Sequence, residues 1–295
     1  MTGFIDPAIK RKSKIVNNAL ASTDGGIPLP SVVEVSESGT CNRSCAFCPR
    51  SNPEYPDLKE FIEPSLIDKL SGQLGDVGYK GIFLFSGFVE PLLDKNIYSL
   101  LALVRRNLPN VKLEMVTNGD VLDARRLNRL FESGLSTILI SVYDGPDEAD
   151  AFEKLCSDAG LKSNQYVVRH RYLPPEDDFG ITLSNRSGMM DTAEFVIPST
   201  ADPLRVACYY PHYTFFMDYL GDVLMCPHDW GKKLIVGNMK QQNFLDIWTG
   251  KKMATSRKRL AEADRKFSPC DKCDVKGTLM GKEHAAAWNN YESSR

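Results

Sequence analysis

Three cysteines within eight residues constrain this chain more than any other feature of its sequence. Cys41, Cys45 and Cys48 form the segment Cys-Asn-Arg-Ser-Cys-Ala-Phe-Cys. Thiolates at this spacing can hold three irons of a [4Fe–4S] cube, which leaves the fourth iron open to a substrate or cofactor. A zinc site would need a fourth ligand, and no further Cys or His lies within 100 residues. An incomplete zinc site and three incidental thiols are the alternatives.

The other five cysteines bring the total to eight. Cys156 stands alone, whereas the last four lie toward the C-terminus and end in Cys-Asp-Lys-Cys: Cys208, Cys226, Cys270 and Cys273. No apolar stretch is long enough for a transmembrane helix or a secretory signal, so we expect a cytoplasmic protein. Thiols stay reduced there, and the cysteines therefore indicate metal ligands or reactive thiols rather than disulfides.

The overall charge argues against a nucleic-acid partner. The formal net charge is −2, whereas domains that neutralise a phosphate backbone are usually basic. The aromatic run at 209–216 lacks an interleaved basic cluster, so we interpret it as core packing rather than a stacking platform. We expect neither a nucleic-acid nor a membrane partner.

Strand and helix patterns alternate along most of the chain. Amphipathic helices are predicted at 64–74, 97–107, 123–133 and 147–158, and strands at 32–38, 81–85, 112–116, 137–143, 165–172 and 181–185. Alternation of this kind predicts an α/β fold with a parallel sheet. Six strands without a glycine-rich phosphate loop favour a partial (β/α)6 TIM-type barrel over a doubly wound sheet. The site is expected at the carboxyl ends of the strands, where the polar segments fall.

The predicted secondary-structure pattern changes near residue 206. A hairpin is predicted within 214–226 and helices at 244–248 and 253–263, which suggests a small α+β domain. We therefore expect an N-terminal extension, predicted to be helical, at 1–30, a barrel at 31–205, a second domain at 206–275, and a tail at 276–295 with a short helix through 283–291.

The cysteine segment, with the aromatic Phe47 inside it, resembles the radical S-adenosylmethionine (SAM) superfamily. The resemblance covers about residues 32–275. In that family three cysteines hold a cluster whose open iron is chelated by the amino and carboxylate groups of SAM. The resemblance implies that Cys41, Cys45 and Cys48 are these ligands and that Phe47 packs beside the adenine.

Further segments resemble the family's SAM-binding elements. Ser86-Gly87-Phe88-Val89-Glu90 is similar to the Gly-Gly-Glu element after the second strand, although Ser86 replaces the first glycine and Val89 precedes the glutamate. The resemblance implies a set of SAM contacts, of which Glu90 and Arg186 are also candidate catalytic residues: Ser86, Gly87, Glu90, Thr117, Asn118, Ser141, Asn185 and Arg186. The last two are expected to follow the sixth strand. Taken alone, Arg186 is typical of a surface ion pair; at a barrel mouth it would meet SAM or an anionic or hydroxylated substrate.

The C-terminal region resembles the twitch subdomain, a shorter relative of the SPASM domain. The resemblance implies that the cysteines at 208, 226, 270 and 273 hold one auxiliary [4Fe–4S] cluster with no open iron. Half a zinc knuckle is the alternative interpretation. His228 follows Cys226 closely, and we interpret it as a polar loop residue rather than a ligand.

These features predict a radical SAM enzyme that oxidises an alcohol carbon of a small polar substrate, favouring a carbohydrate or cyclitol. A 5′-deoxyadenosyl radical would abstract hydrogen, the auxiliary cluster would accept an electron, and flavodoxin or ferredoxin would supply the external electron. An epimerase is an alternative, but it needs a hydrogen donor, and the spare thiol Cys156 is predicted on the apolar face of a helix, as a structural residue. A tyrosine could donate instead. A peptide maturase and a non-enzymatic iron–sulfur protein are the further alternatives.

Overall fold

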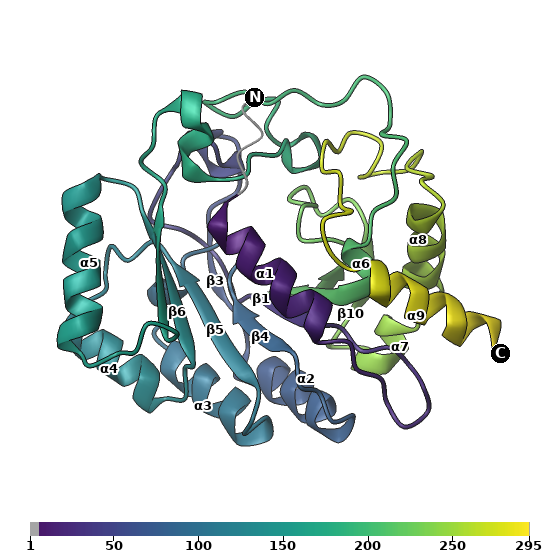
Figure 1. The fold of residues 1–295 in the computed structure, drawn as a ribbon, viewed down its shortest axis with the longest axis horizontal. Coiled ribbons are helices and arrows are strands. Elements are labelled where there is room, and N and C mark those ends of the chain that lie inside the picture. The colour runs from purple at the N-terminus through teal and green to yellow at the C-terminus, as the bar shows by residue number, and fades with distance from the viewer. Residues whose placement is uncertain (1–5, 295) are drawn as a thin grey trace.

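One eight-stranded sheet forms the centre of the computed structural model, which describes residues 6–294 (Figure 1). Its strand order is β10-β9-β8-β1-β4-β5-β6-β7. All neighbours from β8 to β7 are parallel, while β9 and β10 extend the β8 edge in antiparallel fashion. The strands are β1 (Val32–Ser36), β4 (Ile82–Phe85), β5 (Lys112–Thr117), β6 (Thr137–Val142), β7 (Tyr166–His170), β8 (Thr214–Asp218), β9 (Asp222–Leu224) and β10 (Ile235–Asn238).

Helices connect the parallel strands, which confirms the predicted mixed α/β fold. They are α2 (Pro64–Asp76), α3 (Ile97–Asn107), α4 (Ala124–Glu132) and α5 (Pro146–Asp158), and they cover one face of the sheet (Figure 1). In α2, Leu66, Leu70 and Leu74 are buried at intervals of four residues, so one stripe of the helix meets the core. No helix among residues 6–294 is long and apolar enough to cross a membrane.

The opposite face of the sheet is covered by α1 (Pro7–Asn18), shown in purple in Figure 1. Pro7 occupies the first turn, and the Asp6 side chain caps the helix by accepting a hydrogen bond from the backbone N–H of Ala8 at 2.8 Å. Arg11 Nη1 donates to Glu114 Oε2 on β5 at 3.0 Å. A helix therefore forms within the segment predicted to be helical, and it is fixed to the face of the parallel strands opposite α2–α5.

The sixth parallel strand differs from the prediction. Residues 181–185 form no strand; β8, much later in the chain, pairs in parallel with β1 and completes the set. Asp178 and Phe179 have left-handed backbone (φ +52° and +54°), and a Cβ on Gly180 would lie 2.1 Å from the carbonyl oxygen of His170. The chain therefore turns across the end of β7 instead of running beside it.

The C-terminal part continues the same sheet. The predicted hairpin is confirmed as β8 and β9, and a short two-stranded sheet of β2 (Ser38–Gly39) and β3 (Leu58–Phe61) flanks the first strand. The remaining helices are α6 (Tyr210–Tyr213), α7 (Phe244–Trp248), α8 (Lys251–Ala261) and α9 (Lys282–Ser293), of which α9 confirms the predicted terminal helix. Because β8 pairs with β1, strands from before and after residue 206 belong to one sheet. The domain boundary placed at residue 206 therefore stays a prediction.

A buried arginine ties α8 to α9. Arg257 is 1% exposed, and its guanidinium carbon lies 3.9 Å from the ring centre of Trp248 and 3.6 Å from that of Trp288. Its Nε donates to the Pro211 carbonyl at 2.9 Å and its Nη1 to the Trp248 carbonyl at 2.8 Å. The side chain thus satisfies two buried carbonyls between two aromatic rings.

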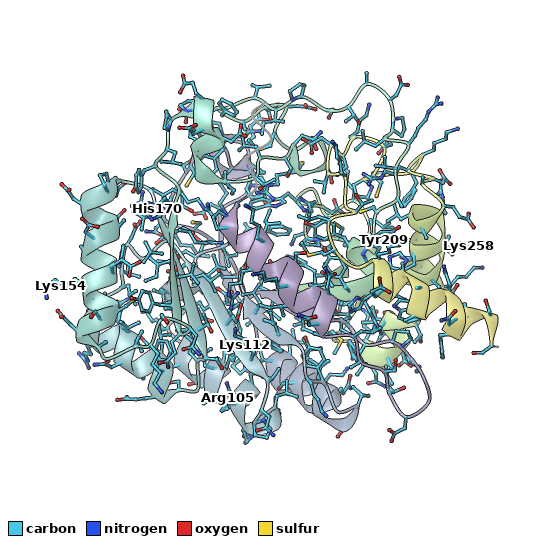
Figure 2. The ribbon with its side chains drawn as sticks, in the orientation of Figure 1. Arg105, Lys112, Lys154, His170, Tyr209 and Lys258 are labelled. Atoms are coloured by element: carbon cyan, nitrogen blue, oxygen red, sulfur yellow. The ribbon has the colours of Figure 1, made fainter. Side chains whose placement is uncertain are left out.

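We expect Arg257→Ala to lower the free energy of unfolding by about 3 kcal/mol, because it leaves buried carbonyls unpaired and removes two desolvated cation–π contacts. Lys258→Ala on the exposed side of α8 is the control, with an expected change below about 0.5 kcal/mol (Figure 2). Urea denaturation measures both. Equal stability of the two variants would contradict the role of Arg257.

Candidate functional site

The predicted cluster-binding loop follows β1 and lines a cavity of about 320 Å³ at the carboxyl ends of the parallel strands. Cys41, Cys45 and Cys48 all face this cavity as free thiols. Burial raises the pKa of Cys41 to about 11 and that of Cys45 to about 12. Iron coordination deprotonates cysteine thiols outright, so three half-buried thiols beside an open cavity fit a cluster that shares its fourth iron with a small molecule.

The structure brings nearly all of the predicted SAM contacts to this cavity. Its lining includes Phe47, Ser86, Gly87, Glu90, Thr117, Asn118, Ser141 and Arg186. Gly87 has φ +108°, and a Cβ there would lie 3.0 Å from Ser36 Cβ and 3.2 Å from the Phe216 ring. A glycine is therefore required at this turn. Ser86, which replaces the family's first glycine, is not among the residues with positive φ, and its Oγ donates to Glu34 at 3.0 Å.

Asn185 is the exception, because it does not line the cavity. Its side chain is fully buried, donates to the carbonyl of Lys272 at 2.7 Å and accepts from the N–H of Ser187 at 3.1 Å. These bonds hold Arg186, whose own backbone is left-handed (φ +46°), against the segment that carries the last cysteines. Strained backbone of this kind persists only where the surroundings enforce it. Asn185 is thus placed to position Arg186 rather than to contact SAM.

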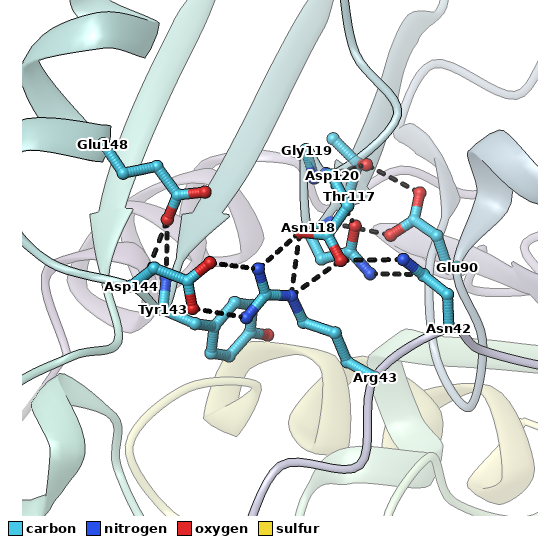
Figure 3. Close-up of polar contacts among 10 residues, drawn as sticks. All are labelled: Asn42, Arg43, Glu90, Thr117, Asn118, Gly119, Asp120, Tyr143, Asp144 and Glu148. Carbon is cyan, nitrogen blue, oxygen red and sulfur yellow. Dashed lines mark hydrogen bonds and ion pairs between the residues drawn. The ribbon is translucent and has the colours of Figure 1, made fainter.

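Glu90 lines the cavity and accepts three hydrogen bonds. Thr117 Oγ1 donates to it at 2.6 Å and the N–H of Asn118 at 2.7 Å, as Figure 3 shows. The third donor is the N–H of Leu92, at 2.9 Å. Glu90 is 1% exposed, and burial outweighs these donors and raises its pKa from 4.5 to about 7. The carboxylate therefore joins the segments after β4 and β5, and no cation among residues 6–294 forms an ion pair with it.

The raised pKa of Glu90 predicts a pH dependence of stability. A folded-state pKa above the unfolded value contributes stability that is complete below pH 4.5 and is lost as the pH rises through about 7. We expect Glu90 alone to lower the free energy of unfolding of the metal-free protein by about 3 kcal/mol over this range. Urea denaturation of Glu90→Gln should lack this slope; parallel pH profiles of the two proteins would contradict it.

A charged network fixes the cysteine loop to the ends of β5 and β6 (Figure 3). Arg43 Nε donates to Asp120 at 2.8 Å, and its Nη1 donates to Asp144 at 2.8 Å. Asn42 bridges the same region, since its Nδ2 donates to Asp120 at 2.7 Å and its Oδ1 accepts from Asn118 Nδ2 at 2.7 Å. The two carboxylates hold the Arg43 pKa above its usual range. The loop is therefore pre-organised by groups that the sequence analysis did not single out.

Arg169 is a second residue that sequence reasoning missed. It lies on β7, its Nη2 donates to Ser141 Oγ at 2.5 Å, and its buried Nε has no hydrogen-bond partner in the structure. Burial, reinforced by the nearby Arg171, lowers its pKa to about 10. A half-buried cation that forms no ion pair within residues 6–294 suits an anionic ligand group. Its position near the end of a predicted strand was the available signal.

The four C-terminal cysteines line a second, smaller cavity. Burial raises the pKa of Cys208 to about 11, and burial together with the neighbouring thiols raises that of Cys226 well above its ordinary value. A Cβ on Gly277 would lie 2.3 Å from Cys208 Sγ, so a glycine is required beside the thiols. Arg265 braces the surrounding backbone by donating to the carbonyls of residues 206, 207, 275 and 276.

Both sets of thiols suit a polynuclear cluster. Within residues 6–294, no three His, Cys, Asp or Glu side chains are grouped to hold a single metal ion. A [4Fe–4S] cube takes one thiolate at each of several irons, so its ligands do not converge on one atom. Each set instead consists of free thiols that line one cavity, three in one case and four in the other.

A thin aromatic wall separates the two cavities. Tyr210 and His228 line both of them, and their rings meet edge to face with centres 4.9 Å apart. Cys156, in contrast, lies fully buried in the core on α5 and lines neither cavity, as predicted.

Comparison with known proteins identifies the family. The radical SAM superfamily matches residues 36–169, and an iron–sulfur cluster-binding domain, SPASM, matches residues 208–274. The S-adenosyl-L-methionine-dependent 2-deoxy-scyllo-inosamine dehydrogenase of Niallia circulans is 31% identical over 247 residues, which cover 83% of this chain and 92% of that protein. The chain belongs to the radical SAM superfamily. Helix α1 lies outside both matched segments.

Solved structures agree with this assignment. The crystal structure of BtrN in complex with AdoMet and 2-DOIA is 28% identical, covers 87% of this chain and 98% of that chain, and gives a TM-score of 0.71. Native anSMEcpe with bound AdoMet, at 15% identity and a TM-score of 0.52, shares the fold and covers 90% of this chain and 97% of its own. This radical SAM enzyme is an oxidoreductase that uses SAM and two [4Fe–4S] clusters and acts on a small molecule, which confirms the predicted family, fold and cofactors.

Proposed function

We propose that this radical SAM enzyme oxidises a hydroxyl-bearing carbon of a carbohydrate or cyclitol by two electrons. The observation that carries the proposal is the wall of Tyr210 and His228, because a substrate in the first cavity lies directly beside the four-cysteine cavity. Such an arrangement suits the removal of an electron from the substrate. The similarity to a dehydrogenase of 2-deoxy-scyllo-inosamine supports the same class of reaction.

The seven predicted cysteine ligands belong to two separate sites. In this proposal Cys41, Cys45 and Cys48 hold the SAM-binding cluster, and the cysteines at 208, 226, 270 and 273 hold the auxiliary one. Oxidation of an alcohol to a ketone removes a hydrogen atom, a proton and one further electron. When bound, SAM and its cluster supply the radical that takes the hydrogen atom, and the auxiliary cluster accepts the electron.

The chain's own residues orient SAM. Phe47, which stacks near Tyr143 with ring centres 6.2 Å apart, offers an aromatic surface for the adenine. Arg169 and Ser141 present donors to the SAM carboxylate, and Gly87 lets the backbone approach the methionine ammonium, with Glu90 below it. Arg186 lines the same cavity, within electrostatic reach of Cys48, and is assigned to the substrate.

This chemistry requires an electron donor and a reducing compartment. A flavodoxin or ferredoxin is proposed as the one-electron donor, and the cytoplasm as the compartment, because free thiols and clusters require a reducing environment. The domain boundaries at 31–205 and 206–275 are retained as a proposal, supported by the separate positions of the two cysteine sets.

The test is a substrate screen under strict anaerobiosis. Reconstituted enzyme, SAM and dithionite are incubated with a panel of cyclitols and sugars, and 5′-deoxyadenosine and carbonyl products are quantified. The proposal expects one ketone for each 5′-deoxyadenosine formed in a coupled reaction. A product isomeric with its substrate, carrying solvent deuterium at the reacting carbon, would establish epimerisation instead.

Cys156 provides an independent check on that alternative. It is fully buried on α5, away from both cavities, so it has no route to a substrate radical. We expect Cys156→Ala to cost about 1–2 kcal/mol of stability through lost packing while ketone formation per folded enzyme stays within about twofold. Loss of turnover in a folded variant, with SAM cleavage intact, would identify Cys156 as a hydrogen donor.

A further inference from the structure

The charges that line the substrate cavity are unevenly paired. Its cationic side chains are Lys12, Arg43, Arg50, Arg169, Arg171 and Arg186, and its carboxylates are Asp6, Glu34 and Glu90. Carboxylates neutralise three of these cations, since Arg43 pairs with Asp120 and Asp144, Arg50 with Asp57, and Arg171 with Asp6. Lys12, Arg169 and Arg186 form no ion pair within residues 6–294.

SAM accounts for only one of these three cations. Arg169 is bonded to Ser141 at the strand ends, where the proposed function places the SAM carboxylate. Lys12 and Arg186 remain. Asp274 feels the field of Arg186, but its carboxylate accepts the N–H of Asn185 at 3.0 Å and does not line the cavity. Glu34 lies on β1, and its carboxylate accepts a hydrogen bond from Ser86 Oγ, so it belongs to the part of the cavity wall that the sheet forms.

Lys12 and Arg186 flank the wall that faces the auxiliary site. Lys12 Nζ lies 6.0 Å from the ring centre of Tyr210, and Arg186 Nη1 lies 3.5 Å from His228 Nδ1. Because the rings of Tyr210 and His228 meet each other, the two cations lie near one continuous aromatic surface and line the same cavity. The guanidinium of Arg186 also lies 5.9 Å from the ring centre of Trp230.

Helix α1 holds Lys12 in this position. Asp6, Ile9 and Lys12 recur every three residues, share one face of the helix and all line the cavity. The ion pair of Asp6 with Arg171 at 2.5 Å anchors the start of the helix, and the bond from Arg11 to Glu114 anchors its middle. The Lys12 ammonium is therefore presented by a fixed element rather than by a loop.

We propose that α1 is part of the substrate site and that Lys12 and Arg186 bind an anionic substituent, a phosphate monoester or a carboxylate, on the polyol. This inference rests on the proposed function and narrows its substrate class to anionic carbohydrates or cyclitols. An anion between the two cations would hold the polyol ring against Tyr210 and His228, on the side of the cavity nearest the four cysteines. Charge-assisted bonds to both cations would set the orientation.

The experiment measures binding to anaerobic, SAM-loaded holoenzyme by titration calorimetry. The probes are myo-inositol 1-phosphate, glucuronate, neutral myo-inositol and an aminocyclitol. We expect the anionic probes to bind at least tenfold more tightly than the others, with the phosphate and carboxylate arms showing which anion fits. Lys12→Ala should weaken binding of the anionic probe about ten- to hundredfold and leave the neutral probe unaffected.

Lys14→Ala is the matched control, since Lys14 is exposed on the same helix and does not line the cavity. Equal affinity for neutral and anionic probes, or a Lys12→Ala variant that binds them as wild type does, would overturn the inference. Weakened SAM binding in Lys12→Ala would overturn it too, because Lys12 would then serve the cofactor. If an anionic probe binds through Lys12 while neither it nor any other polyol yields a ketone, that result would refute the proposed oxidation but would leave the anion site in place.

Discussion

Replacing Cys41, Cys45 and Cys48 together by alanine is expected to abolish 5′-deoxyadenosine formation while about four irons per chain remain. The three thiols line the SAM cavity and lie apart from the four-cysteine cavity. The loop that carries them is tied to β5 and β6 by Arg43, so the substitution removes ligands without removing the anchor. Iron analysis and quantification of 5′-deoxyadenosine under reductant measure both outcomes.

The retained irons serve as the control for folding in this variant, because an auxiliary cluster assembles only if the C-terminal cysteines converge. Arg43→Ala is an informative companion: it keeps the ligands but releases the loop, so cleavage should slow while the irons remain near eight. A triple variant that still cleaves SAM would refute the assignment of these three residues.

The second large effect is expected from the auxiliary site. Replacing Cys270 and Cys273 by alanine should leave about four irons and preserve SAM cleavage within a few-fold, yet reduce ketone formation at least about a hundredfold. The SAM cavity does not include either residue, whereas the four-cysteine cavity loses two of its thiols. Uncoupled cleavage is the signature, and the ratio of ketone to 5′-deoxyadenosine measures it.

That ratio separates the proposal from its main competitor. An enzyme whose reaction is redox-neutral needs no electron acceptor, so its product yield per 5′-deoxyadenosine would survive the loss of the auxiliary cluster. Unchanged ketone formation in a variant with about four irons would show that the electron leaves by a route other than the cavity behind Tyr210 and His228.

Local sequence patterns predicted most of the helices and strands, because the spacing of apolar residues reflects which side chains of an element are buried. The helix at 97–107 was predicted to its exact residues, and the strand ends carrying Thr117 and Ser141 were found because buried apolar runs precede polar turns. Residues 181–185 also carry a strand-like pattern, but no neighbouring edge receives them. The pairing of β8 with β1 spans most of the chain and leaves no local mark.

The residues of the candidate site likewise fall into those that the sequence could predict and those that only the fold reveals. Spacing singled out the first three cysteines, and the resemblance to the twitch subdomain grouped the last four; the structure places the two sets at two separate cavities. Lys12, Arg43 and Arg169 escaped notice because each acts through partners distant in sequence. Asn185 was assigned to SAM from its neighbourhood, whereas its side chain is occupied in holding Arg186. A residue type reveals its chemistry, but only the fold reveals its partner.

Iron and acid-labile sulfide content of the anaerobically reconstituted wild-type protein, measured together with SAM cleavage under reductant, tests the central claim most directly. Two complete clusters predict about eight irons and about eight sulfides per chain, with 5′-deoxyadenosine produced. Zinc in place of iron, with no cleavage of SAM, would contradict the account at its base.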